Sequence, residues 1–311
     1  MKNKISIVTP CYNEETNVQE VYERVKQVIQ THLQQFEYEH IFIDNASKDK
    51  TVAILKRIAA TDKNVKIIVN TRNFGHIRSP YHALLQAKGD VVILIVADLQ
   101  DPPSMIVDFI TKWKEGYKIV LGVKNDAEES PAMFAIRKTY YNMIARLSDI
   151  NLTKNNTGFG LYDQIVIQKL REIDDPYPYF RGLISDLGYE SAKIPYKQPV
   201  RKRGITKNNF YTLYDIAMLG ITNHSKVPLR CATIAGFSMS AFSLLLALGY
   251  LVAKLIFWDI FKLGTAPVVI GLFFFSSVQL FFIGIIGEYI GSIQTQVMKR
   301  PLVIEKERIN F

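Results

Sequence analysis

The chain has 311 residues, which is enough for one sizeable α/β domain and an appended segment, and 48% of its residues are hydrophobic, a high share for a soluble enzyme. Its net charge of +9 is not gathered into a compact basic module, so anionic lipid head groups or phosphorylated ligands explain it better than nucleic acid. Its two cysteines, Cys11 and Cys231, are too few and too far apart for a disulfide framework or a cysteine metal cluster.

The first half of the chain alternates short apolar runs with helical segments. Residues 4–10, 38–43 and 65–69 predict strands, and the first is followed by a helix that reaches about Thr31. Such a regular alternation predicts a doubly wound, mostly parallel sheet with right-handed crossovers. The loop after a first strand is a common nucleotide-binding position. The residues there also suit an ordinary turn and helix cap.

The apolar run 91–97 predicts a strand that is buried on both faces, and it ends in Asp98, Gln100, Asp101 and two prolines. Open α/β sheets bind ligands beyond the carboxyl ends of their strands. The oxygen atoms of these three side chains suit Mg²⁺ or Mn²⁺ on a diphosphate. A strand followed by a solvated acidic turn is the competing interpretation.

The last third of the chain predicts a membrane hairpin. Residues 231–253 and 263–287 carry no charged side chain, and each run can cross a hydrocarbon core of ~30 Å as a helix. The short aromatic connector 254–262 suits a turn at the far interface. The apolar run 5–8, in contrast, is too short for a cleavable signal. A buried hairpin of a soluble domain is the less favoured alternative, because neither run has a polar face.

Charges and periodicity then place the remaining segments. Basic residues flank the hairpin on one side, so the bulk of the chain is expected in the cytoplasm. These residues are Lys226, Arg230, Lys299 and Arg300. Apolar residues between Phe210 and Ile221 recur at three and four, which predicts an amphipathic helix lying on the membrane, with a core helix as the alternative. The expected organisation is a cytoplasmic domain (1–207), an interface helix (208–229), a transmembrane hairpin (230–293) and a cytoplasmic tail (294–311).

Four segments in this order resemble the successive motifs of family 2 glycosyltransferases. They are residues 9–14 (TPCYNE), 43–51 (IDNASKDKT), 72–76 (RNFGH) and 97–103 (ADLQDPP). Together with the predicted hairpin, they make the whole chain similar to the polyprenyl-phosphate glycosyltransferase branch of that family. The resemblance implies a GT-A-like domain that transfers a sugar, with inversion, from a nucleotide sugar, for which UDP is the expected carrier. It also implies undecaprenyl phosphate as acceptor, a multi-pass location in the bacterial plasma membrane and a homo-oligomer, expected to be a tetramer.

The same resemblance assigns the nucleotide and metal sites. Pro10, Tyr12, Glu14 and Asp44 would bind the nucleotide, and Asp98 with Gln100 would bind Mg²⁺ or Mn²⁺ and the donor diphosphate. The family usually has a second aspartate two residues before Asp98. This chain has Val96 there, which weakens the expected metal site.

The resemblance also assigns basic residues. Arg201 and Lys207 match a family motif of the form Arg-x-x-Gly-x-Ser-Lys, with Thr206 for the serine, and would neutralise the departing diphosphate during catalysis together with Asp98. Residues Arg137, Lys138 and Arg181 would meet the acceptor phosphate. A solvated helix face is the competing interpretation for the first two of these. For the basic run 201–207, a patch that holds lipid head groups competes for Lys202 and Arg203.

The motif at residues 156–163 departs from the family. The family places an aspartate, taken as the general base, at the position of Gly158 and an arginine at Gly160. A phosphate monoester has a second pKa of about 6, so near neutral pH it is largely a dianion that needs no base. The missing base therefore favours a phosphate acceptor over a hydroxyl, unless Asp163 swings into the site. The alternative is a catalytically silent membrane scaffold or regulatory subunit that still binds nucleotide.

Overall fold

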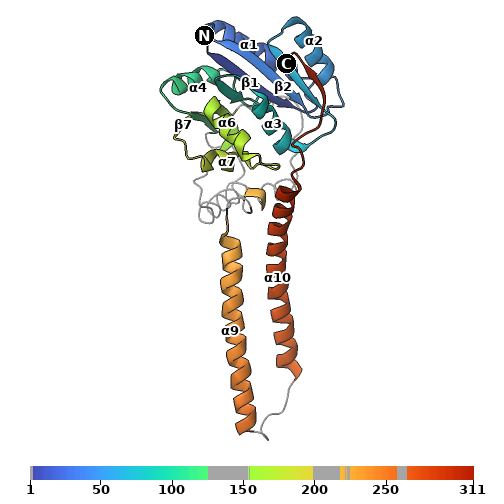
Figure 1. Cartoon of the computed structure of the whole chain (residues 1–311), viewed down its shortest axis with the longest axis vertical. Helices are drawn as coiled ribbons and strands as arrows, with labels where there is room; N and C mark the ends of the chain where they lie inside the picture. Colours follow the sequence, from blue (N-terminus) through green and yellow to red (C-terminus); the bar gives the residue numbers. More distant parts are fainter. Residues whose placement is uncertain are drawn as a thin grey trace.

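The computed structural model describes residues 3–124, 153, 155–198, 218–220, 222, 225–257 and 265–311. An α/β domain lies at one end of two long helices, and the two described chain ends lie on that domain (Figure 1). The described residues form an eight-stranded sheet with the order β7-β5-β6-β4-β1-β2-β3-β8. The strands are β1 (Lys4–Cys11), β2 (Glu37–Asp44), β3 (Val65–Asn70), β4 (Val91–Leu94), β5 (Ile119–Lys124), β6 (Asn156–Asp163), β7 (Ser191–Tyr196) and β8 (Glu305–Ile309). The helices are α1 (Val18–His32), α2 (Thr51–Thr61), α3 (Gly75–Gln86), α4 (Met105–Lys114), α6 (Gln164–Ile173), α7 (Phe180–Asp186), α9 (Val227–Ile256) and α10 (Thr265–Met298).

The centre of the sheet is parallel, which confirms the predicted α/β class. Strand β1 pairs in parallel with β2 and β4, β2 with β3, and β5 with β7. Strand β4 is buried on both faces: Ile93 packs in a core with helices α1 and α4, and Val92 packs in a second core with α3 and α6. This double burial explains why the run is continuously apolar. The regular strand ends at Leu94, earlier than the apolar run predicts.

Strand β6 is antiparallel to both of its neighbours, β4 and β5. The sequence analysis does not predict this strand, because its first half contains Asn156, Gly158 and Gly160 and lacks the β-branched residues typical of strands. Leu94 lies opposite Gly160, and Val91 lies opposite Asp163. Strand β6 therefore starts at the edge of the sheet where β4 ends, and it finishes at the opposite edge.

The charged tail is part of the sheet. Strand β8 pairs with the outer edge of β3 in antiparallel fashion. Beyond it, the side-chain amide of Asn310 donates to the carbonyl oxygens of Ala59 and Val65 at 2.9 and 2.8 Å. The end of α10 is thus tied to the sheet through residues 299–304.

Two helices are long and apolar enough to cross a membrane. The qualifying segments are Val227–Leu246 of α9 and Gly271–Met298 of α10, and no residue in the most apolar window of either is buried in the described structure. Large apolar side chains such as Phe237 and Phe273 are 74% and 68% exposed. A buried hairpin of a soluble domain would not leave such surface open. Most of the predicted interface helix lies outside the described residues, although residues 218–220 are helical.

At the amino-terminal edge of the sheet, one buried carboxylate joins several strands. Glu39 in β2 is 1% exposed and accepts hydrogen bonds from Lys4 and Lys66, both at 2.7 Å, and from Ser6 at 2.6 Å. Burial alone would raise the pKa of Glu39, but these hydrogen bonds outweigh it and lower the pKa to about 2. The cluster fixes the starts of the strands whose other ends form the crevice.

We expect Glu39→Gln to lower stability by about 3 kcal/mol near neutral pH, because two lysines lose their buried partner. The pKa of Glu39 is lowered on folding, so its contribution is complete above the ordinary value of 4.5 and disappears as the pH falls towards 2. In thermal melts of the full chain in detergent, the melting temperature of the variant should therefore lie below that of wild type at neutral pH, and this difference should shrink on acidification. A difference in melting temperature that stays constant from pH 7 to pH 3 would contradict this account.

Candidate functional site

The loops after β1 and β2 hold each other at the carboxyl edge of the sheet. The Asn13 amide donates to Ser47 Oγ and the Asn13 side chain accepts from the Lys48 amide, both at 2.8 Å. The Glu14 amide donates to Thr51 Oγ1 at 2.9 Å. Asn13 has a φ of 56°, a left-handed conformation that asparagine tolerates well. These bonds fix the loop that carries Tyr12 and Glu14, two of the predicted nucleotide residues.

Asn45, directly after β2, fixes the neighbouring loop. Its Nδ2 donates to Asn73 Oδ1 at 2.9 Å and to the Gly75 carbonyl at 3.0 Å. Its Oδ1 accepts from the Phe74 amide at 2.9 Å and from Asn70 Nδ2 at 3.1 Å. The loop before α3 therefore has a defined position beside the crevice.

Asp44 ends β2 as a fully buried carboxylate. Its Oδ2 accepts from the Ser47 amide at 2.9 Å, but its buried Oδ1 has no hydrogen-bond partner among the residues that the structure describes. Burial raises the pKa of Asp44, although the bonds from Ser47 oppose the shift. A buried acceptor without a donor is costly, so a ligand that offers an N–H or O–H group here would be stabilised.

The turn after β4 presents Asp98 and Gln100. Both are partly exposed, and Asp98 Oδ1 accepts from the Gln100 amide at 3.1 Å. Leu99 between them has a φ of 62°, an uncommon value for a leucine, so the surrounding structure must hold the turn in place.

Asp101 holds this turn. It is 4% exposed, and its two carboxylate oxygens accept from the Val96 amide at 3.3 Å and from the Tyr196 hydroxyl at 3.0 Å. Burial raises the pKa of Asp101 to about 6. Both oxygens are engaged within the protein, so Asp101 positions the turn and Asp98 is the carboxylate left to face a ligand.

The side-chain oxygens of Asp98 and Gln100 fit a metal ion that is also bound by a substrate. No group of three or more His, Cys, Asp or Glu side chains suited to a metal occurs in the part of the chain that the structure describes. Mg²⁺ commonly keeps several waters and uses one or two carboxylates together with substrate phosphates. Asp98 and Gln100 fit such a bridging ion, whereas the residues present do not form a complete protein cage.

A cavity of about 250 Å³ lies beside this turn. It brings Pro10 and Arg181 together with Val96, which forms part of the apolar wall where the family carries a second aspartate. His76 and Thr157 also line it. The sequence analysis gives these two residues no role, although His76 ends one of the motifs that carry the resemblance. Sequence alone could not show that α3 lies along the cavity.

The backbone of β6 disfavours the family's residues at both glycine positions, for a different reason at each. A Cβ atom at Gly160 would lie 2.4 Å from the Val120 carbonyl oxygen, so this backbone excludes any side chain there. Gly158 has a φ of 94°, which disfavours other residues, and a Cβ there would point to Leu94 and Phe180. Both of these neighbours line the 250 Å³ cavity. The position expected to carry a general base is therefore occupied by bare backbone.

Asp163 lies at the other end of β6 and is held there. Its carboxylate accepts from Trp113 Nε1 at 2.7 Å, from Lys118 Nζ at 3.0 Å and from the Ile165 amide at 3.0 Å, the last as an N-cap of α6. Strand pairing places it opposite Val91, at the start of β4. Asp163 cannot swing into the crevice, so it is excluded as a replacement base.

Four predicted site residues lie outside the described residues: Arg137, Lys138, Arg201 and Lys207. The structure therefore gives no position for the predicted leaving-group cations or for two of the three predicted acceptor-phosphate residues.

The comparisons with known proteins complete this description. Residues 6–170 match the profile of glycosyl transferase family 2, which is more than half of the chain. The chain belongs to glycosyltransferase family 2. It is 35% identical over 302 residues to an uncharacterised glycosyltransferase of Bacillus subtilis (strain 168), covering 96% of this chain and 92% of the relative. It is 32% identical over 307 residues to the bactoprenol glucosyl transferase of Shigella phage SfII, covering 98% of each.

These relatives confirm the predicted family, its polyprenyl-phosphate branch and the assignment as a glycosyltransferase. Among solved structures, the chain is similar to glucosyl-3-phosphoglycerate synthase from Mycobacterium tuberculosis in complex with Mn²⁺, UDP-glucose and phosphoglyceric acid. That similarity has a TM-score of 0.45 at 16% identity and covers 71% of this chain and 78% of the synthase.

The role of Asp101 can be tested through the pH dependence of stability. We expect Asp101→Asn to keep the turn, because the amide oxygen can accept from Val96 while Nδ2 donates to Tyr196. The pKa of Asp101 rises on folding from 3.8 to about 6, so its proton stabilises the fold fully below 3.8 and this contribution is lost as the pH rises through 6. In detergent melts, the free energy of unfolding of the variant should therefore rise by on the order of 2 kcal/mol relative to that of wild type between pH 4 and pH 7. A variant that loses stability relative to wild type over this range would contradict the assignment.

Proposed function

We propose that this glycosyltransferase moves a sugar from a nucleotide sugar, with UDP as carrier, to polyprenyl phosphate at the cytoplasmic face of a bacterial plasma membrane. The observation that carries the proposal concerns two residues of β6, Gly158 and Asp163. Gly158 offers only backbone at the position where a base is expected, and the carboxylate of Asp163 is hydrogen-bonded at the far edge of the sheet. The described residues that line the cavity include no carboxylate that could act as the expected base, which suits an acceptor that is already anionic.

The donor side of the proposal rests on the loops after β1 and β2. The unpartnered Oδ1 of Asp44 is suited to accept a hydrogen bond from the base or ribose of a nucleotide. Tyr12 and Glu14 are carried by the neighbouring, tightly bonded loop, and Pro10 lies near the end of β1. We therefore assign the nucleotide to this end of the crevice and its diphosphate to the turn of Asp98 and Gln100.

In the proposed reaction, an oxygen of the acceptor phosphate attacks the anomeric carbon from the face opposite the leaving group. The new carbon–oxygen bond forms as the bond to the diphosphate breaks, and the electron pair leaves with the nucleotide diphosphate, so the configuration inverts. A divalent Mg²⁺ or Mn²⁺ held by Asp98 and Gln100 would supply charge stabilisation on that diphosphate. Arg181, which lines the cavity, is suited to hold the incoming phosphate. We assign Arg201 and Lys207 to the leaving group on the family resemblance.

The membrane location of the acceptor gives the two exposed helices a function. A polyprenyl chain stays in the bilayer, so an enzyme anchored by α9 and α10 meets its acceptor without extracting it. The apolar faces of these helices are uncovered in the single chain, which is compatible with the homo-oligomer, and in particular the tetramer, that the resemblance implies. We include this assembly in the proposal.

A catalytically silent scaffold that binds nucleotide is the second candidate, and Val96, Gly158 and Gly160 favour it. Incubating the purified chain with labelled nucleotide sugars and undecaprenyl phosphate separates the two. Labelled lipid supports the transferase, whereas nucleotide binding without any labelled lipid supports the scaffold.

Asp98 and Asp163 form a matched pair for mutagenesis. We expect Asp98→Asn to lower turnover on the order of a hundredfold or more, because the diphosphate loses its metal-holding carboxylate. Asp163→Asn makes the same chemical change at the opposite edge, and asparagine is an equally good N-cap, so turnover should stay at the wild-type level. Equal losses in both variants, or none in Asp98→Asn, would remove Asp98 from the site.

The acceptor's own ionisation should set the acid limb of the pH–rate profile. The rate is expected to fall as the pH drops through the second pKa of the acceptor phosphate, about 6. A phosphorothioate acceptor, which has a lower second pKa, should move that limb to lower pH. Asp101 also titrates near this value, so Asp101→Asn serves as the control and should leave the limb in place. An acid limb that stays at the same pH with both acceptors would indicate that a base of the protein titrates there instead.

A further inference from the structure

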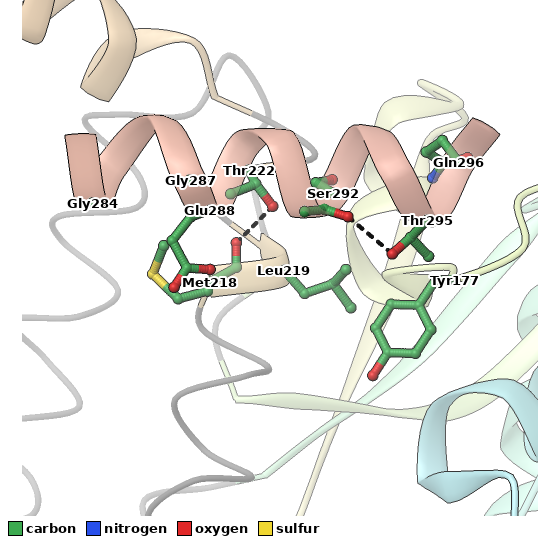
Figure 2. A pocket seen from close by; sticks show the side chains of 11 residues that line it. Tyr177, Met218, Leu219, Thr222, Gly284, Gly287, Glu288, Ser292, Thr295 and Gln296 are labelled. Carbon is green, nitrogen blue, oxygen red and sulfur yellow. Dashed lines mark hydrogen bonds between the residues drawn. The ribbon is translucent and has the colours of Figure 1, made fainter. Parts of the chain in front are cut away.

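A second cavity lies where α10 leaves the membrane, separate from the cavity of the proposed transfer site. Its volume is about 270 Å³, and it is lined by Arg78 of α3, Pro176 and Tyr177 of the loop before α7, and Thr295, Met298 and Arg300 at the end of α10. It shares no lining residue with the cavity that contains Pro10 and Arg181. It adjoins a larger cavity of about 520 Å³ along α10, and Figure 2 shows the two residues common to both, Tyr177 and Thr295, side by side beneath the helix.

The charge in this small cavity is positive and is not balanced by the residues that line it. Two of the lining side chains are guanidinium groups, and none of the described lining residues is a carboxylate. Asp175, which precedes Pro176 in the chain, accepts through Oδ1 from Gln296 Nε2 at 2.9 Å and from the Tyr177 amide at 2.8 Å. Partial burial lowers the pKa of Arg78, and the positive charges of Arg72 and Arg300 add to this effect.

Arg78 also has a donor to spare. One of its terminal nitrogens donates to the Pro301 carbonyl oxygen, which anchors the guanidinium beside the chain that leaves α10. Its Nε is buried and has no hydrogen-bond partner among the described residues. An oxygen-rich anion would satisfy this donor and relieve the repulsion between the arginines, and the planar guanidinium group matches phosphate oxygens well.

The level of the cavity relative to the membrane indicates where such an anion would come from. The apolar segment Gly271–Met298 has 28 residues. At ~1.5 Å per residue it rises about 42 Å, whereas a hydrocarbon core is ~30 Å thick. The last turns of α10 therefore reach the head-group layer. Apolar side chains remain exposed in these last turns, with Val297 at 75% and Ile293 at 60%, and they offer acyl chains a surface on the helix end that precedes Arg300.

We propose that the cavity of Arg78 and Arg300 binds the phosphate of an anionic phospholipid of the cytoplasmic leaflet, as a site distinct from the acceptor site. The proposal rests on the membrane orientation given under the proposed function. A lipid head group and a soluble anion could both supply the phosphate group that this cavity would bind. The exposed apolar side chains at the end of α10 favour the lipid. Such a lipid would join α3, which borders the crevice, to the end of the membrane helix.

The test uses the full chain in a neutral detergent, with short-chain phosphatidylglycerol as the probe and native mass spectrometry to count bound lipid. We expect Arg78→Gln/Arg300→Gln to weaken binding about tenfold or more, since each basic residue near a membrane surface contributes on the order of 1 kcal/mol to anionic lipid binding. Arg57→Glu, at an exposed arginine of α2, changes the total charge by the same two units as either test variant and should bind as wild type does. Because Arg78 also bonds Pro301, the single variant Arg300→Glu provides a second test that leaves this bond intact, and it should weaken binding as well.

Two further arms identify the source of the phosphate. Inorganic phosphate at the same concentration should fail to displace the lipid; displacement would assign the cavity to a soluble anion and overturn the proposal. In turnover assays, Arg300→Glu, which keeps the bond between Arg78 and Pro301, should keep the wild-type KM for polyprenyl phosphate, whereas a raised KM would assign the cavity to the acceptor and also overturn the proposal. Unchanged phosphatidylglycerol binding in both arginine variants would overturn it directly.

Flotation of wild type with phosphatidylcholine vesicles tests the membrane location separately, so failure there counts against the proposed function and can be told apart from failure of the lipid site.

Discussion

The reversed direction of β6 is the constraint on which the chemistry of this site depends. A strand inserted antiparallel between β4 and β5 presents its first residues at the crevice and its last residue at the opposite edge. Gly158 therefore borders the cavity while Asp163 caps α6 far from it. The close approach of Gly160 to the Val120 carbonyl keeps the strand free of any larger side chain at that position. At Gly158, the position expected to carry the base, the positive φ of 94° rather than tight packing disfavours a side chain, which is consistent with the proposed anionic acceptor.

The two edges of the sheet use buried carboxylates in opposite ways. Glu39, at the amino-terminal edge, is surrounded by donors that lower its pKa, and it stabilises the fold as an anion. Asp44 and Asp101, at the carboxyl edge, have raised pKa values because burial outweighs their hydrogen bonds. Glu39 is thus saturated with hydrogen bonds where it stabilises the fold, whereas Asp44 keeps one oxygen without a described partner at the edge proposed to bind the nucleotide. This is the pattern expected when functional sites carry strain that the rest of the fold supports.

Sequence patterns predicted the parts of the fold that depend on local periodicity. The strands that became β1, β2 and β3 and the two membrane helices were predicted because their apolar runs are continuous and bounded by polar residues. Helix α3 contains Pro80, which interrupts the helical pattern in the sequence without ending the helix. Strand β6 and the pairing of β8 with β3 were not predicted, since both depend on a partner strand distant in the chain. The same reason applies to Asp163: its side chain is plausible for catalysis, and only the strand direction excludes it.

The tail gives the membrane helix a direct connection to the crevice. Residues 299–304 run from the end of α10 to β8, and β8 pairs with β3. Strand β3 leads into the loop that Asn45 fixes before α3, and α3 lines the cavity beside Asp98. A second connection runs through Arg78, which joins α3 to the Pro301 carbonyl at the end of α10. A shift of α10 relative to the membrane surface would therefore act on the crevice along two bonded routes. An enzyme whose acceptor stays in the bilayer benefits from such a connection, because the height of the crevice above the lipid phosphates decides whether acceptor and donor meet.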